Sequence, residues 1–463
     1  MSGRPDAAQQ DAARTLEEMK RVREIEEQIL ARAPENDVHP SLERITAVME
    51  LAGDPQRTYP AIHLTGTNGK TSTSRMIDAI LRESGLSTGR FTSPHLHDIR
   101  ERITLSGKPI SREKFIAAYD ETAPLIDIVD ARSLESGGRR MNFFEVLVAL
   151  AYAAFADAPV DVAIIEVGLG GSWDATNVID AQVAVVTPVD LDHTHLLGDD
   201  VVSIAEEKSG IIKPGAVTVS GTQDDDVAQV LRDRVEEVGG SRIVFEGNDF
   251  GVLTREVALG GQQLSLRGLA GEYADLFLPV HGAHQASNLA TAVAAVESFI
   301  GGGEQRIDPD LLVAACAAMT SPGRLEVVRR SPTVLVDAAH NPHGARSLVA
   351  AIDEAFTFTR LVGLVGIVAD KDAVGMLEVL EPAVDHVVIT RSSSPRAMAP
   401  DRLGALATEI FGEGRVTVVR DLPDALEQAV TFAESEGMGG GVIATGSVIT
   451  AGEVRMLLGR TDV

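Results

Sequence analysis

The sequence predicts an α/β protein with two sheet-containing domains of unequal size. Short, nearly continuous runs of β-branched and apolar residues alternate with segments of helical periodicity along most of the chain. Such runs are typical of parallel strands that helices cover on both faces. A chain of 463 residues also exceeds the size at which one hydrophobic core keeps growing. We expect a large domain with a doubly wound, mostly parallel sheet, followed by a smaller Rossmann-like α/β domain.

Charge and composition exclude several classes of partner. The formal net charge is -27, so nucleic acids and anionic membranes would repel the protein at long range. A locally positive cleft for a nucleotide stays compatible with this charge. The first 35 residues are polar where a secretory signal would be apolar, and no apolar run is long enough to cross a bilayer. We therefore expect a cytoplasmic protein with no nucleic-acid or membrane partner.

The single cysteine, Cys316, excludes an intramolecular disulfide and a cysteine-rich zinc site. It lies in the apolar, helix-compatible stretch 311–319. We expect a buried structural thiol rather than a nucleophile.

The first predicted element is an amphipathic helix over residues 10–32, which we assign to an N-terminal helical extension, residues 1–40. Its apolar face is formed by Leu16, Met19, Val22, Ile25 and Ile29. We interpret it as a packing helix, with a partner-binding helix as the alternative. A second, short helix around residues 42–51 leads into the first strand.

The turn that follows this strand is predicted to bind phosphate. Gly66 and Gly69 let backbone N–H groups turn toward an anion, and a helix begins directly afterwards. Lys70 would supply a mobile cation for the outer phosphates, and Thr71 would offer its hydroxyl to Mg2+. The common form of this motif has a glycine where the chain has Leu64, so the motif is only partly met. The alternative is a glycine-rich turn between a strand and a helix, with an anion-binding lysine only by accident.

The rest of the large domain continues the alternation. Strands are predicted at residues 160–167, 183–187 and 216–220. Short alternating runs in residues 242–280, interrupted at Gly260, predict a small antiparallel addition. A helix over residues 285–299 closes the domain.

The strongest breaks in the middle of the chain are Gly301–Gly303 and Ser321–Gly323, and we place the domain boundary near the second. The predicted domains are thus residues 41–321 and 322–463. Strands of the second domain are expected at residues 333–337, 361–367, 386–390, 415–420 and 441–445. This domain lacks the G-x-G-x-x-G fingerprint of dinucleotide-binding folds.

Residues just past the strands are candidates for chemistry, because ligands bind beyond the carboxyl ends of strands in such sheets. Ser93 follows one strand end, and Glu166 ends a buried strand ahead of two glycines. A buried carboxylate is costly unless it is paired or holds a metal, so we favour metal coordination by Glu166 over a structural salt bridge.

Two aspartates and two histidines follow the next strand and could together form a metal site. They are Asp190, Asp192, His193 and His195. Mg2+ prefers oxygen ligands, so a lone imidazole would be unusual for it, and Mn2+ can substitute. The alternative is that one histidine is a ligand and the other only caps or packs.

Other polar residues are ambiguous when taken alone. Lys208 reads as a salt-bridged surface lysine. Asp337 and His340 lie between a strand and a helix of the second domain, where they could reach toward an interdomain cleft. Asn288 and Arg324 flank the predicted domain boundary. Each of these would more often be structural.

Six motifs occur in a fixed order along the chain: Thr65–Thr71, Thr92–Leu96, Glu166–Gly171, Leu191–Thr194, Glu207–Ile211 and Asp337–Pro342. Together they make the chain resemble the folylpolyglutamate synthase/dihydrofolate synthase family, which belongs to the Mur-type ATP-dependent amide ligases. The resemblance covers about residues 40–460. It implies that the large domain is a Mur-ligase-type ATP-binding domain and the second a ligase domain, with hinge motion near residues 320–324.

The resemblance also implies roles for individual residues. Nucleotide contacts would come from Gly66, Thr67, Asn68, Gly69, Lys70, Thr71, Asn288, Arg324, Asp337 and His340. Thr71, Ser93, Glu166 and His193 would serve around two Mg2+ ions, and Lys70, His193 and Lys208 would be catalytic. Phe144, Asp174 and Ala175 match the pteroate-binding side. Lys208 matches a lysine that is carbamylated in the family, although the usual Glu-Lys-Ala-Gly is Glu-Lys-Ser-Gly here.

The implied activity is ATP-dependent ligation of L-glutamate to a folate or dihydropteroate carboxylate. Phosphoryl transfer from ATP to the carboxylate gives an acyl phosphate, which the α-amino group of glutamate can attack. The family expectation is a monomer. One alternative is a Mur ligase acting on a peptidoglycan precursor, against which Thr92–Leu96 and Phe144 argue. Another is a non-catalytic nucleotide-dependent switch, but the chain lacks a guanine-reading Asn-Lys-x-Asp.

Overall fold

The structure is a computed structural model that describes residues 7–34, 37, 39–435 and 437–460. These residues form two compact units, and each unit draws on separate parts of the sequence. The first unit falls within residues 1–93, 99–245 and 294–305, and the second within residues 94–98, 246–293 and 306–463. Residues 1–6, 35, 36 and 38 of the predicted N-terminal extension lie outside the described residues.

The first unit is built on an eight-stranded sheet with the order β4-β3-β2-β5-β1-β6-β7-β8. The neighbouring strands β2, β5, β1, β6, β7 and β8 all pair in parallel, whereas β3 pairs antiparallel with β2 and β4. The mostly parallel sheet that the sequence predicts is therefore confirmed. The strands are β1 (Ala61–Thr65), β2 (Thr88–Phe91), β3 (Ile103–Leu105), β4 (Lys108–Pro109), β5 (Val162–Glu166), β6 (Val183–Val186), β7 (Val217–Ser220) and β8 (Arg242–Phe245).

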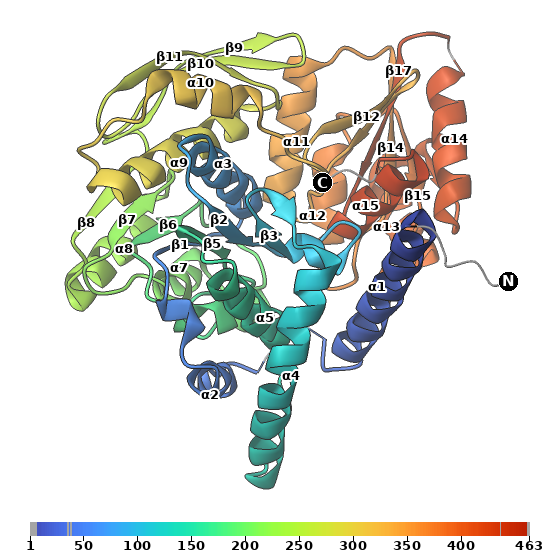
Figure 1. Cartoon of the computed structure of the whole chain (residues 1–463). Helices are drawn as coiled ribbons and strands as arrows, with labels where there is room; N and C mark the ends of the chain where they lie inside the picture. Colours follow the sequence, from blue (N-terminus) through green and yellow to red (C-terminus); the bar gives the residue numbers. More distant parts are fainter. Residues whose placement is uncertain (1–6, 35–36, 38, 436, 461–463) are drawn as a thin grey trace, which may run out of the picture. The chain divides into compact units, whose positions relative to one another are not determined.

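Helices connect and cover these strands (Figure 1). The helix after the phosphate-loop motif begins at Lys70, because Gly69 adopts a left-handed conformation at its N-cap. The helices are α1 (Ala7–Leu30), α2 (Glu43–Leu51), α3 (Lys70–Glu83), α4 (Arg112–Glu135), α5 (Phe143–Asp157), α6 (Thr194–Leu197), α7 (Val201–Ser209) and α8 (Asp225–Val238), together with α9 (Ala283–Gly301), which contributes residues to both units.

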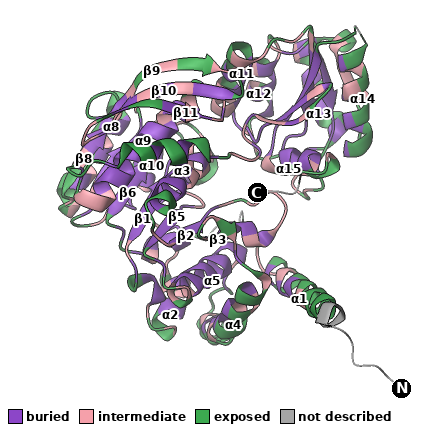
Figure 2. Cartoon of the chain, turned by 45° about the horizontal axis from the view of Figure 1, so that its top comes forward, coloured by how far each residue is buried: buried purple, intermediate pink, exposed green. Residues whose placement is uncertain are grey.

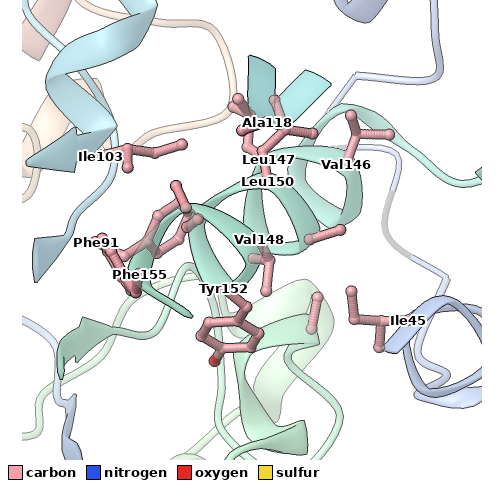
Figure 3. Close-up of a cluster of buried hydrophobic side chains, with 14 of the residues drawn as sticks. Ile45, Phe91, Ile103, Ala118, Val146, Leu147, Val148, Leu150, Tyr152 and Phe155 are labelled. Atoms are coloured by element: carbon pink, nitrogen blue, oxygen red, sulfur yellow. The ribbon is translucent and has the colours of Figure 1, made fainter. Parts of the chain in front are cut away.

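Helix α5 forms the centre of the apolar core of the first unit. It is apolar on nearly all sides, and a capping box between Asn142 and Glu145 fixes its start. Figure 2 shows it almost wholly buried, and Figure 3 shows its side chains against Phe91 and Ile103 of the sheet. The hydroxyl of Tyr152, in the second half of the helix, donates to the carbonyl of Thr176 at 2.6 Å.

The N-terminal helix α1 packs on the first unit only over its second half. Val22, Ile25 and Ile29 are buried, as the packing interpretation predicts, but Leu16 and Met19 are 54% and 49% exposed. Ion pairs attach the helix and its C-terminal end to α4: the side chain of Arg21 lies 2.6 Å from Asp120, and that of Arg32 lies 2.8 Å from Asp130. The expected apolar face is therefore wrong for its first two residues.

The second unit contains two sheets. The small antiparallel addition is confirmed as the sheet β11-β10-β9, formed by β9 (Gly251–Ala258), β10 (Gly261–Arg267) and β11 (Glu272–Leu278). It belongs to the second unit, however, and not to the unit of the large parallel sheet to which the sequence assigns it. The other sheet has the order β12-β13-β17-β14-β15-β16, with one more strand than the sequence predicts because β12 adds an antiparallel edge. Its strands are β12 (Glu326–Arg330), β13 (Thr333–Val336), β14 (Arg360–Val365), β15 (His386–Ile389), β16 (Val416–Val418) and β17 (Gly440–Thr445).

The second unit's helices are α10 (Pro309–Ala317), α11 (Pro342–Ala355), α12 (Ala373–Leu380), α13 (Pro400–Phe411), α14 (Leu422–Glu434) and α15 (Val448–Leu457). Cys316 is fully buried in α10, and burial raises the pKa of its thiol to about 12, which confirms a structural thiol. Within the described residues, no helix is both long and apolar enough to span a membrane.

The core position of α5 predicts a large effect of truncation there. Leu150 is fully buried, so Leu150→Ala should lower the free energy of unfolding by about 2–5 kcal/mol. The matched control Leu134→Ala, on α4, removes the same atoms from a side chain that is 48% exposed, and it should change stability by about 0.5 kcal/mol or less. Equal losses in urea unfolding would contradict the assigned core.

Candidate functional site

The phosphate-loop motif lies between β1 and α3, and its shape requires glycine. Gly66 has φ of +138°, and a Cβ at this position would lie 2.0 Å from Oγ1 and 2.7 Å from the carbonyl oxygen of Thr187. A side chain therefore cannot be added without moving the backbone that follows β6. The loop is also tied to that segment by the N–H of Thr67, which donates to the carbonyl of Pro188 at 3.0 Å.

Leu64, the departure from the common motif, belongs to the sheet rather than to the loop. It is fully buried in β1, in register with Glu166 of β5 and Val185 of β6. A glycine here would leave a cavity between packed layers. The loop thus begins at Gly66, beyond the position at which the common motif has a glycine.

Two lysines meet at the carbonyl oxygen of Gly66. The Nζ of Lys70 donates to it at 2.9 Å and to the carbonyl of Thr67 at 3.1 Å. The Nζ of Lys208 donates to the same Gly66 oxygen at 3.0 Å. The structure therefore brings together the two lysines that the family resemblance implies are catalytic.

Lys208 is buried, so the expectation of a surface lysine is wrong. Burial, and next the positive charge of Lys70, lower the pKa of Lys208 to about 7. The carboxylate of the neighbouring Glu207 accepts the hydroxyl of Ser172 at 2.5 Å and the N–H of Gly171 at 3.2 Å. Glu207 thereby shapes the glycine turn after β5, a role that the sequence did not suggest.

Thr71 and Glu166 are in direct contact. The Thr71 hydroxyl donates to Oε1 of Glu166 at 2.8 Å, and Glu166 is 1% exposed at the end of β5. Two arginines that the sequence analysis passed over, Arg75 and Arg90, interact electrostatically with this carboxylate. Burial lowers the pKa of both guanidinium groups, that of Arg75 to about 9. A carboxylate and a hydroxyl, both oxygen donors, fit a hard cation such as Mg2+.

The segment 190–195 does not form a cluster of metal ligands. The carboxylates of Asp190 and Asp192 accept the backbone N–H groups of the residues that follow them, at 2.7 and 2.8 Å. His193 has φ of +51°, and its ring centroid lies 6.3 Å from that of the exposed His195. Among the described residues, no group of three or more His, Cys, Asp and Glu side chains could hold a metal ion.

The other predicted set of metal ligands is Thr71, Ser93, Glu166 and His193. It stays a prediction, because two of these ligands are hydroxyls and the absence of a cluster of His, Cys, Asp and Glu in the described part of the chain does not test it. Ser93 is half-buried, two residues after β2 ends at Phe91.

The residues of the predicted pteroate-binding side meet around the turn after β5. Phe144 packs against Gly168 so closely that a Cβ there would lie 2.5 Å from its ring. Asp174 accepts the N–H of Leu169 at 2.9 Å and the hydroxyl of Thr176 at 2.5 Å. Burial raises the pKa of Asp174 to about 6, although these hydrogen bonds oppose the shift. Ala175 is buried next to it.

In the second unit, Asp337 and Arg324 lie close together. The Asp337 carboxylate accepts the N–H groups of Leu325 at 2.8 Å and Ala339 at 2.7 Å. Burial raises its pKa, and Arg324 opposes that shift. Arg324 also acts on His284, whose pKa is lowered to about 4, mainly by burial.

The other two predicted nucleotide contacts are placed by neighbouring residues. Asn288 is buried on α9, and its side-chain amide donates to the side chain of Gln285 at 3.2 Å. The Nδ1 of His340 lies 3.0 Å from the carbonyl of Ala338. His340 therefore comes directly after the turn in which the N–H of Ala339 donates to the Asp337 carboxylate.

Comparison with known domains defines the class of protein. Residues 64–296 match the Mur ligase middle domain, and residues 323–448 match the Mur ligase, glutamate ligase domain. The chain therefore belongs to the Mur ligases.

Individual relatives narrow this class. A dihydrofolate synthase/folylpolyglutamate synthase of Mycobacterium tuberculosis is 47% identical over 480 residues, which cover 99% of this chain and 98% of the relative. An enzyme of the same name from Bacillus subtilis is 31% identical, over 91% of this chain and 95% of its own length. The chain is thus a member of the folylpolyglutamate synthase/dihydrofolate synthase family, and the first match includes most of the N-terminal extension.

Solved structures agree with this family. Folylpolyglutamate synthase of Mycobacterium tuberculosis, crystallised with ADP and AMPPCP, has a TM-score of 0.91 at 46% identity, over 96% of this chain and 100% of that chain. An FPGS complex with AMPPCP and folate has a TM-score of 0.81 at 29% identity, over 94% and 99% of the two chains.

The geometry at Gly66 generates a paired prediction. Gly66→Ala should weaken ADP binding by about tenfold or more, because the loop must move away from Thr187. Gly260→Ala, at φ of +78° with nothing within 4 Å of the added Cβ, should cost only about 1–2 kcal/mol of backbone strain and leave binding unchanged. Calorimetric titration and thermal melts separate the two effects. Wild-type ADP affinity in Gly66→Ala would contradict the assigned loop.

Proposed function

We propose that this protein is an ATP-dependent ligase that joins L-glutamate to the carboxylate of a folate or a dihydropteroate. The observation that carries the proposal is the phosphate loop of a folylpolyglutamate synthase family member, where Lys70 and Lys208 share the Gly66 carbonyl and Thr71 contacts Glu166. This arrangement supplies cations for the phosphates of a nucleoside triphosphate and oxygen donors for its metal ion.

The proposed residues act through position and charge. Lys70 and the N–H groups of the loop hold the ATP phosphates as the γ-phosphoryl group passes to the substrate carboxylate. Thr71, Ser93, Glu166 and His193 would hold Mg2+, which when bound neutralises charge on the phosphate oxygens. The resulting acyl phosphate is attacked by the α-amino group of glutamate, so no protein nucleophile is needed.

Lys208 is proposed to be carbamylated. The reaction joins a neutral amine to CO2 and releases a proton, so it needs a lysine that loses its proton near neutral pH. Burial lowers the pKa of Lys208 to about 7, which supplies that state. The product places a carboxylate-like anion beside the ammonium group of Lys70, where a protonated Lys208 would place a second cation. This change would relieve the repulsion between the two ammonium groups.

The remaining assignments extend the same proposal. Asn288, Arg324, Asp337 and His340 are nucleotide contacts, and Phe144, Asp174 and Ala175 receive the pteroate side. The proposed domains are an extension at residues 1–40, an ATP-binding domain at 41–321 and a ligase domain at 322–463, supported by matches that end at residue 296 and begin at residue 323.

The oligomeric state and location complete the proposal. The enzyme is a monomer in the cytoplasm, which suits a chain whose single cysteine is a buried thiol.

A substrate panel tests the function. With ATP and Mg2+, the purified protein should release ADP and form an amide product from L-glutamate and either dihydropteroate or a tetrahydrofolate monoglutamate. The two arms decide which synthase activity is present. Product formation only with a nucleotide-linked peptidoglycan precursor, or no ADP release with any acceptor, would overturn the proposal.

Lys70→Ala should reduce turnover by roughly a hundredfold or more, because the phosphates lose their charge partner while the fold is kept. The control Lys114→Ala removes an exposed lysine from α4 and should behave as wild type. Both rates are measured by ADP release, with melting temperatures recorded alongside. Substantial activity in Lys70→Ala would remove the phosphate-loop assignment.

Carbamylation of Lys208 should be visible by NMR with 13C-bicarbonate, developing as pH rises through about 7. The folded pKa is lowered, so between about pH 7 and 10 the unfolded chain binds more protons, and the unmodified protein gains stability as pH rises. Lys208→Arg should lose the signal, whereas Lys108→Arg, at an exposed lysine, should keep it. A signal that survives in Lys208→Arg excludes this site.

A further inference from the structure

The five residues that follow Ser93 belong to the second unit, although the chain on both sides of them belongs to the first. They form the segment Pro94–Asp98. Ser93 is one peptide bond from this segment, so whatever fixes the segment also limits where the Ser93 hydroxyl can lie. The contacts that fix it come from α15 and from the turn before β12.

The segment is fixed first by close backbone packing. A Cβ on Gly452 of α15 would lie 2.6 Å from the carbonyl oxygen of Leu96, and one on Gly323 would lie 3.1 Å from the Leu96 side chain. The backbone of Leu96 thus occupies space that Gly452 leaves open, and its side chain lies close to Gly323. Such proximity to a helix backbone restricts the segment to one path.

It is fixed next by a buried guanidinium. Arg455 of α15 is 1% exposed, and its Nη1 lies 2.8 Å from Nε2 of His97. A guanidinium has donors only, so Nε2 of His97 must be the acceptor and its proton must lie on Nδ1. The contact is therefore directional and specific to a side chain with an acceptor at that reach.

The same guanidinium holds the turn that carries Arg324. Its Nε and Nη2 donate to the two oxygens of Glu326 at 2.7 and 3.2 Å. Glu326 also accepts the N–H of Gly323 at 2.7 Å, and the carbonyl of Gly323 accepts the N–H of Ala338, next to Asp337. One residue therefore connects the segment after Ser93 with the turn on which the proposed nucleotide contacts depend.

We propose that Arg455 is a positioning residue that orders the segment after Ser93 and the Gly323–Arg324 turn together, by binding His97 with one side of its guanidinium and Glu326 with the other. The proposal rests on the proposed function, in which Ser93 serves a metal ion and Arg324 a nucleotide. Arg455 is not among the residues proposed to contact either ligand. Its effect should appear in the metal requirement and in turnover, rather than in binding of glutamate.

The test uses His97 as well as Arg455, because breaking a buried ion pair can unfold a protein. His97→Leu removes the acceptor and leaves the pair of Arg455 with Glu326 intact, whereas His97→Gln retains an acceptor at similar reach. Arg455→Met removes the guanidinium. Arg420→Met is the matched control, because the Nη2 of Arg420 donates to both carboxylate oxygens of Asp401 at an exposed site of the same unit.

His97→Leu and Arg455→Met should raise the half-saturating Mg2+ concentration roughly tenfold and lower kcat about tenfold. The KM for glutamate should stay within about twofold, since a shift of the Ser93 segment acts on the metal and the transferred phosphoryl group. His97→Gln should recover most of the loss, and Arg420→Met should match wild type. Hydrogen exchange should show faster exchange of the amides of residues 95–98 in His97→Leu.

Wild-type Mg2+ dependence and kcat in a folded His97→Leu would overturn the proposal and leave Arg455 as a stabiliser of the second unit alone. Failure of the wild-type protein to release ADP with any acceptor is a different result, because it removes the proposed function. In that case the positioning role of Arg455 is tested by Mg2+-dependent ADP binding and by hydrogen exchange. Unchanged values of both in His97→Leu and in Arg455→Met would overturn the positioning role.

Discussion

The carbonyl oxygen of Gly66 accepts hydrogen bonds from Lys70 and Lys208, so this one atom connects the phosphate loop with both α3 and α7. Two ammonium groups placed so close together repel each other, and burial makes the charge of Lys208 still less favourable. The loop can hold them only because β1 and β6 bring Gly66 and Thr187 into contact without a side chain between them. The fold thus places two lysine side chains next to each other, in a protein whose net charge is -27.

Most strands and the phosphate loop could be predicted from the sequence, because their signals are local. The apolar runs at β5 and β6 are short and β-branched, as strands covered on both faces must be. The proximity of Thr71 and Glu166 agrees with a general rule of such sheets, since the parallel strands β1 and β5 deliver their carboxyl ends to one edge. Leu64 shows the same logic, because its burial explains why a glycine is absent there.

What the sequence could not supply depends on tertiary packing. Lys208 looks like a surface lysine because its acidic neighbours suggest solvent, but the fold turns Glu207 toward Ser172 and Lys208 toward Gly66. The aspartates near His193 look like metal ligands, yet their carboxylates accept the backbone N–H groups of the residues that follow them. The apolar face of α1 is longer than the surface that covers it. In each case the local pattern is compatible with two environments, and only distant residues select one.

The hydroxyl of Thr176 determines which ring nitrogen of His63 carries the proton. Because it donates to Asp174, it can only accept from Nε2 of His63, 2.9 Å away on β1. His63 is fully buried, and burial lowers its pKa to about 3, so it is a neutral imidazole whose single proton must sit on Nε2. Each group therefore donates to the next, His63 of β1 to the Thr176 hydroxyl and this hydroxyl to the carboxylate of Asp174. A valine at position 176 would keep the shape and erase this direction, while a serine would preserve it.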